Sequence, residues 1–277
     1  MTIVGLNFEI PPTSIQMEKN FKKTYRSDVK KGVWHGRYVV IKKLQKQVAS
    51  TLEIKILKEE ISQIRILSHK NLELIIAACL TLPHLSILTE FEANGNLFDL
   101  LRSPSWELGP STAILIAIGI CDGMIYLEEQ RAHHYNLKSK NVLITADNIP
   151  KLADYGFKDS IFASYPKLTA ADQSVYASQI QLDKQTGKIE VKYPPSLLYD
   201  VPWVAPEILL AMSADSNLEV DFSCADVYSY GVVFFEIVTR SEPYEEMNNM
   251  RIGYLVSNLN VRPEVPDFVP DNLVSSF

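Results

Sequence analysis

A lysine, two carboxylates and an amide lie in an order that suits the handling of a nucleotide phosphate. Lys42 ends the apolar run Val39-Val40-Ile41, Glu60 follows in a helical segment, and Asn141 and Asp154 flank a later short strand. Phosphoryl transfer needs a lysine on the phosphates, a glutamate that holds this lysine, oxygen ligands for magnesium, and an aspartate that orients the attacking hydroxyl. These residues are therefore candidates for the parts that such a site requires.

Other short motifs surround these residues and strengthen the prediction. A lone lysine at a strand end is usually a solvated surface residue, and a lone Asp-Tyr-Gly is usually a turn. Their occurrence together, in one order and on the expected elements, is poorly explained by chance. The motifs are Leu67-Ser68-His69-Lys70-Asn71, Leu88-Thr89-Glu90-Phe91, His134-Tyr135-Asn136-Leu137-Lys138-Ser139-Lys140-Asn141, Asp154-Tyr155-Gly156, Ala205-Pro206-Glu207 and Asp226-Val227-Tyr228-Ser229-Tyr230-Gly231.

The elements that must position these motifs change in type along the chain. The first third reads as strands with one helix, and the remainder reads as helical, which predicts an α+β fold with a small and a large part. The two helices expected after residue 110 are apolar nearly all round, as in helices buried at a domain centre. The expected strands are 38–44 and 85–91, and the expected helices are 52–67, 112–129 and 223–239.

Residues 168–199 interrupt the helical pattern. Residues 175–182 and 188–193 alternate in polarity, with 183–187 between them. This pattern is typical of a β-hairpin in a long surface loop, and a loop without regular structure is an equal alternative.

Composition narrows the function classes. The formal net charge is −6, which argues against a general nucleic-acid or membrane-surface role. The three cysteines lie far apart without metal spacing, so we expect reduced core thiols of a cytoplasmic protein. The N-terminus does not read as a signal peptide, and the longest apolar stretch, 113–120, is too short to span a bilayer.

Over residues 14–266 the chain resembles protein kinases, most closely the tyrosine-kinase-like group. Lys138 in the catalytic-loop motif resembles the serine/threonine type. The segments around Val201-Pro202-Trp203 and Thr239-Arg240-Ser241 are similar to the integrin-linked pseudokinase, and Asn136-Leu137-Lys138-Ser139 is similar to the kinase-homology domain of receptor guanylyl cyclases. The resemblance implies a bilobal kinase fold, with a small lobe at about 14–91, a large lobe at about 95–277 and an inserted activation segment at about 157–203.

The resemblance also implies roles for individual residues. Lys42 and Glu60 would form an ion pair at the phosphates, and Asn141 and Asp154 would hold magnesium. Thr89 would guard the back of the nucleotide pocket. The remaining cofactor-binding positions would be Val29, Val40, Glu90 and Phe91, and the catalytic loop would present Asn136 and Lys138.

The chain departs from the kinase pattern at several of these places. Asn136 replaces the catalytic aspartate, and an amide cannot accept a hydroxyl proton at neutral pH. Val40 replaces an alanine above the adenine ring and narrows that slot. The three glycines of the phosphate-covering loop fall at Lys22, Thr24 and Ser27, so the close backbone approach that glycine permits is lost. We therefore expect weak ATP and magnesium binding.

Two further departures concern the large lobe. Tyr135 replaces an arginine that pairs with a phosphorylated activation segment in relatives, so switching by that ion pair is not expected. The C-terminal helices of the fold, and the arginine that pairs with the equivalent of Glu207, have no counterpart after Pro266. We therefore expect an incomplete large lobe or a fragment.

Three functions remain open from the sequence. The first is a pseudokinase that scaffolds or regulates signalling proteins, with weak ATP and magnesium binding, no nucleic-acid partner and no membrane insertion by this segment. The second is a slow but active serine/threonine kinase, since catalysis in this class is mostly positioning and electrostatics. The third is a regulatory segment of a larger receptor cyclase, which requires a membrane span and a cyclase domain on the same polypeptide.

Overall fold

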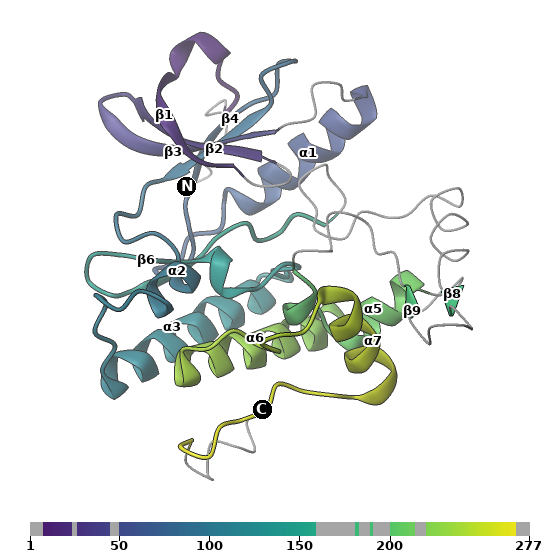
Figure 1. The fold of residues 1–277 in the computed structure, drawn as a ribbon. Coiled ribbons are helices and arrows are strands. Elements are labelled where there is room, and N and C mark those ends of the chain that lie inside the picture. Colours follow the sequence, from purple (N-terminus) through teal and green to yellow (C-terminus); the bar gives the residue numbers. More distant parts are fainter. Residues whose placement is uncertain are drawn as a thin grey trace.

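The computed structural model describes residues 8–23, 27–44, 50–158, 181–182, 189–190, 200–213 and 220–269. Figure 1 shows a sheet with one helix beside it, placed above a larger group of helices. The bilobal α+β architecture that the resemblance implies is confirmed.

The small lobe is built on a five-stranded antiparallel sheet in the order β1-β2-β3-β5-β4. A tight turn at His35 and Gly36, both with positive φ, joins β2 to β3. The strands expected at 38–44 and 85–91 are confirmed as β3 and β5. The strands are β1 (Gln16–Lys23), β2 (Ser27–Trp34), β3 (Arg37–Leu44), β4 (Ile75–Cys79) and β5 (Ser86–Glu90).

Helix α1 (Thr51–Ile64) packs beside this sheet (Figure 1). It begins with a capping box, in which Ser50 accepts from the backbone of Glu53 and the Glu53 carboxylate accepts from the backbone of Ser50. Leu57, Ile61 and Ile64 form its buried face. The helix expected at 52–67 is therefore confirmed, and it ends three residues early.

The large lobe is mainly helical. Its long central helices, α3 and α6, lie side by side, and a short hairpin of strands β6 and β7 lies above them (Figure 1). The elements of the large lobe are α2 (Leu97–Leu101), α3 (Pro110–Glu129), β6 (Val142–Ile144), β7 (Pro150–Leu152), α5 (Pro206–Ser213), α6 (Phe222–Thr239) and α7 (Asn249–Leu259), with 3-10 turns at Ser139–Asn141 and Val201–Trp203. A further 3-10 turn, Pro12–Ser14, precedes β1 in the chain.

Helix α3 is less buried than its sequence suggests. One side packs closely on β7, where a Cβ at Gly123 would come within 2.9 Å of Leu152. The opposite side carries Leu115, which is 65 % exposed, and the isoleucines Ile118 and Ile125, which are also exposed. The expectation of a helix buried all round is wrong for α3, because its neighbours in the described chain cover only one side.

Both α3 and α6 are long and apolar enough to cross a membrane by length and composition alone, a test that core helices also pass.

Two smaller expectations have mixed outcomes. Strands β8 (Gln181–Leu182) and β9 (Ile189–Glu190) pair antiparallel, which supports the predicted hairpin; the rest of 168–199 lies outside the described residues. All three cysteines are free, and Cys79 is buried, but Cys224 is exposed in the first turn of α6, so it is not a core thiol.

Candidate functional site

Lys42 lies between two carboxylates from distant parts of the chain. Its Nζ is 2.8 Å from Glu73 Oε2 and 2.7 Å from Asp154 Oδ1. The Lys42 and Glu73 side chains are 12 % and 2 % exposed, whereas that of Asp154 is 41 % exposed. The ammonium is therefore clasped at the base of the site by a buried carboxylate and at its open side by an accessible one.

The charges of this triad stabilise one another. Burial disfavours the Lys42 ammonium, but the two carboxylates outweigh burial and raise its pKa above the usual value. Burial also raises the pKa of Glu73. Burial acts in the same direction on Asp154, but Lys42 outweighs it and lowers the pKa of Asp154. Lys42 and Asp154 are therefore both charged at neutral pH.

Glu60 does not take the predicted place beside Lys42. Glu60 is half-buried on α1, and its Oε1 accepts a 2.9 Å hydrogen bond from the backbone nitrogen of Lys158. The carboxylates within ion-pair distance of Lys42 are Glu73 and Asp154 instead. The expected Lys42–Glu60 pair is therefore corrected, because α1 directs Glu60 toward the segment that follows Asp154-Tyr155-Gly156.

The register of the sheet places the other predicted nucleotide contacts on the face that carries Lys42. Val40 lies two residues before Lys42, so both side chains point to the same face. Val29 on β2 is the partner of Lys42, and Thr89 on β5 is the partner of Val40. Because directly paired residues share a face, these four side chains border one surface of the small-lobe sheet.

Ion pairs hold the residues that join the two lobes. Glu90 accepts from the backbone nitrogen of Leu74 and pairs at 2.7 Å with Lys151 of β7. Lys151 also pairs with Glu92. The Phe91 ring lies 6.2 Å from that of Tyr38 at the edge of the small lobe. Glu90 and Phe91 therefore lie at the connection between the two lobes.

The loop that holds Asn136 is built around Asn141. The Asn141 side-chain nitrogen donates a 2.9 Å hydrogen bond to the backbone carbonyl of Asn136. The backbone of Ala153, next to Asp154, donates to the Asn141 carbonyl at 2.8 Å. Asn136, Asn141 and Asp154 are therefore held in one connected backbone arrangement, as the predicted roles require.

Lys138 of the same loop forms a 2.7 Å ion pair with Asp200. Lys138 is buried, and Asp200 lies just before the 3-10 turn that leads to Ala205-Pro206-Glu207. The pair therefore connects the catalytic-loop motif to the end of the activation segment. Glu207, whose arginine partner in relatives has no counterpart after Pro266, is half-buried.

A column of side chains connects the lobes behind the site. His134 is buried, and its ring lies 6.4 Å from that of Tyr155. Asp226 accepts from the backbone nitrogens of His134 and Tyr135 at 2.7 and 3.1 Å. Ile64 packs on the next residue, Gly156, where an added Cβ would come within 2.2 Å of its methyl group. Ile64, Tyr155 and His134 thus form a column that rests on the helix of Asp226.

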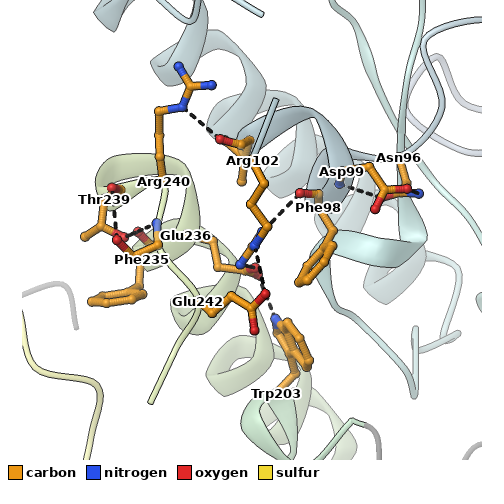
Figure 2. A network of polar contacts seen from close by, with 12 residues as sticks. Asn96, Phe98, Asp99, Arg102, Trp203, Phe235, Glu236, Thr239, Arg240 and Glu242 are labelled. Atoms are coloured by element: carbon orange, nitrogen blue, oxygen red, sulfur yellow. Dashed lines mark hydrogen bonds and ion pairs between the residues drawn. The ribbon is translucent and has the colours of Figure 1, made fainter. Parts of the chain in front are cut away.

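A second polar network supports the base of the large lobe (Figure 2). Glu236 of α6 is fully buried, accepts a 2.8 Å hydrogen bond from the Trp203 indole, and pairs with Arg102 at 2.9 Å. Arg240 reaches from the end of α6 to the carbonyls of Leu101 and Ser103. The network fixes α6 to the segment after α2 and to the turn at Val201–Trp203.

Several of these residues were not identified from the sequence. Glu73 is the most important one, and one signal was available. Glu73 lies between Leu72 and the apolar strand Ile75–Cys79, so the sequence around it suggests burial. A buried glutamate is almost always paired, and a partner for it could therefore have been expected. Asp200, Arg102 and Glu236 gave no comparable signal.

Comparison with known proteins agrees with this geometry. Residues 15–276 match the family described as protein tyrosine and serine/threonine kinase. The chain is 30 % identical over 87 % of its length to the probable serine/threonine-protein kinase SIS8 of Arabidopsis thaliana, and 30 % identical over 86 % to the serine/threonine-protein kinase STY46 of the same plant. It is 28 % identical over 87 % to mitogen-activated protein kinase kinase kinase 12 of Rattus norvegicus.

The chain spans only part of these relatives. It covers 20 % of the first, 36 % of the second and 22 % of the third. The family match, over residues 15–276, contains every residue of the site described above. This chain belongs to the protein tyrosine and serine/threonine kinase family.

Proposed function

We propose that this chain is a pseudokinase, a kinase-shaped module of the cytoplasm that regulates or scaffolds signalling proteins and binds ATP with magnesium weakly. The observation that carries the proposal is Asn136. It stands in an otherwise well-built catalytic loop, at the position of the aspartate that accepts the substrate hydroxyl proton. A positioned general base contributes about 10²–10⁴-fold in rate, and an amide cannot supply it.

The residues at the site fit a nucleotide with magnesium in part. Asp154 and Asn141 offer the oxygen ligands that magnesium prefers, and the Asp154 carboxylate is accessible. Lys42 supplies a fixed positive charge for phosphate. Against tight binding, Lys42 already pairs with Asp154, Val40 narrows the adenine side, and Lys22 stands where the phosphate-covering loop has a glycine in relatives. Bound magnesium would neutralise phosphate charge, while these residues would bind and orient the nucleotide.

A thermal-shift titration tests this binding. We expect magnesium-dependent stabilisation that appears only at high ATP concentration, and its loss in Asp154→Ala. No shift at any ATP concentration, or the same shift in Asp154→Ala, would contradict the proposal that these residues bind the nucleotide.

Phosphate transfer separates the pseudokinase from the slow kinase. The second candidate is favoured by the two Arabidopsis thaliana relatives, which are named as serine/threonine-protein kinases. We expect transfer by the purified chain to be at background, and Asn136→Asp alone to recover little, because Val40 and the loop without glycines remain. Robust transfer by the unmodified chain that Lys42→Met abolishes would establish the slow kinase instead.

A further inference from the structure

We propose that Glu73 is the residue that positions Lys42 for a nucleotide phosphate, in place of Glu60, and that this positioning does not depend on helix α1. The inference rests on the proposed function, because it concerns the same nucleotide site. It assigns to a loop residue before β4 a role that the kinase pattern gives to the helix.

The first observation is the quality of the Lys42–Glu73 contact. Its two side chains are 12 % and 2 % exposed, and Nζ and Oε2 are 2.8 Å apart. The buried Glu73 carboxylate confines the ammonium strongly, because separating the two would leave the Glu73 charge buried without its cation. The lysine therefore has little freedom to leave this position.

The second observation is that Glu73 and Asp154 share one backbone support. The Glu73 nitrogen donates to the Leu152 carbonyl at 2.8 Å, and the Tyr155 hydroxyl donates to the Glu73 carbonyl at 3.0 Å. Leu152 and Tyr155 lie on either side of Asp154 in the chain. The two carboxylates that clasp Lys42 are consequently fixed to each other, through strand β7 and the Asp154-Tyr155-Gly156 motif.

The third observation is the different partner of Glu60. Glu60 on α1 accepts from the backbone nitrogen of Lys158 at 2.9 Å. In kinases the position of the equivalent helix controls whether the lysine is held by its glutamate. Here a displacement of α1 would release the segment at Lys158, while Glu73 would still hold Lys42. The structure thus separates the anchoring of Lys42 from the position of α1.

A double-mutant cycle without nucleotide tests the anchoring. Lys42→Met should lower the denaturant midpoint of unfolding because it leaves the buried Glu73 carboxylate without its cation, and Glu73→Leu should lower it because Lys42 then keeps only the accessible Asp154 as a partner. The double variant Lys42→Met/Glu73→Leu should regain at least half of the loss from either single change, since an apolar pair of similar volume is tolerated at such sites. Combining Lys42→Met with Glu60→Leu should give no such recovery.

Binding of Mg-ATP, measured by titration calorimetry, tests the consequence for the nucleotide. Glu73→Gln should raise the Kd by about tenfold or more, which corresponds to about 1.4 kcal/mol. Glu60→Gln should raise it by less, and Glu59→Gln, on the exposed side of α1, should leave it within twofold. Glu73→Asp, which retains the charge, should recover part of the affinity that Glu73→Gln loses.

The two readouts distinguish failure of the inference from failure of the proposed function. If the unmodified chain does not bind Mg-ATP, the proposed binding fails, and the denaturation cycle still decides whether Glu73 holds Lys42. The inference is overturned if the cycle couples Lys42 to Glu60 instead of Glu73. It is also overturned if Glu60→Gln weakens Mg-ATP binding as much as Glu73→Gln does.

Discussion

The indole of Trp203 donates a 2.8 Å hydrogen bond to the fully buried carboxylate of Glu236. Burial raises the pKa of Glu236, and the donors around it, Trp203 and Arg102, act in the opposite direction. The pair joins the end of the activation segment to the central helix α6, so the stability of the large lobe depends on a polar contact rather than on apolar packing alone (Figure 2).

Trp203→Phe should therefore destabilise the chain by about 1–3 kcal/mol, because it leaves a buried carboxylate without one of its donors. Chemical denaturation measures the change. Trp106→Phe is the matched control: Trp106 is half-buried against the same core, and its indole nitrogen makes no hydrogen bond within the described residues. The control should cost less than about 1 kcal/mol. Equal losses in both variants would show that ring volume, not the hydrogen bond, sets the effect.

Ile64→Asp should unfold or uncouple the small lobe. Ile64 is 3 % exposed and packs on Gly156, so the aspartate would place an unpaired charge in the core at a cost of about 4 kcal/mol or more. Ile66→Asp provides the control, since Ile66 is 75 % exposed and lies two residues away. Circular dichroism during thermal unfolding reports both. A silent Ile64→Asp would contradict the placement of the column of Ile64, Tyr155 and His134.

Tyr155→Phe should cost about 1 kcal/mol or somewhat more, because the Glu73 carbonyl would lose its buried donor. Burial also raises the pKa of Tyr155, so the hydroxyl stays protonated as a donor over the whole working pH range. In Tyr38→Phe, which alters a tyrosine that is 55 % exposed, the change in unfolding free energy should stay within about 0.5 kcal/mol. If the two substitutions are equivalent, the hydroxyl of Tyr155 contributes nothing.

His134 should make the chain sensitive to acid. Burial lowers the pKa of His134 from 6.5 to about 4, and the charged groups facing it include Asp154 and Lys138. Between these two pH values the unfolded chain binds the proton and the folded chain does not, so this contribution to stability is lost as pH falls from about 6.5 to about 4. The full effect is about 3 kcal/mol.

The comparison that isolates His134 is the unfolding free energy of the unmodified chain minus that of His134→Leu, measured across this pH window. Burial raises the pKa of the neighbouring Asp226 to about 7, which makes stability fall as pH rises from 3.8 to about 7. This opposing contribution is present in both proteins and cancels in the difference. A difference that does not change between pH 7 and pH 4 would refute a neutral, buried His134.

Many of the elements and site residues can be predicted from local patterns in the sequence. The period of residues 52–67 and the alternation of strand and helix patterns predict the individual elements, because each depends on short-range geometry. The same holds for Lys42, which lies near the end of strand β3, and for Asp154, which follows strand β7. The bilobal arrangement follows from the resemblance that the order of the motifs carries. The absence of a proton acceptor at Asn136 is a property of the residue type and needs no structure.

The tertiary structure decided which partners these residues have. Glu60 and Glu73 are both glutamates near Lys42 in sequence order, and only the packing of α1 and β7 brings Glu73 within 2.8 Å of the ammonium. The sequence also could not decide that one side of α3 is exposed, because an apolar helix has the same sequence pattern whether or not neighbouring elements cover it. Ion pairs and burial depend on distances between segments 31 to 112 residues apart, and no local periodicity encodes those distances.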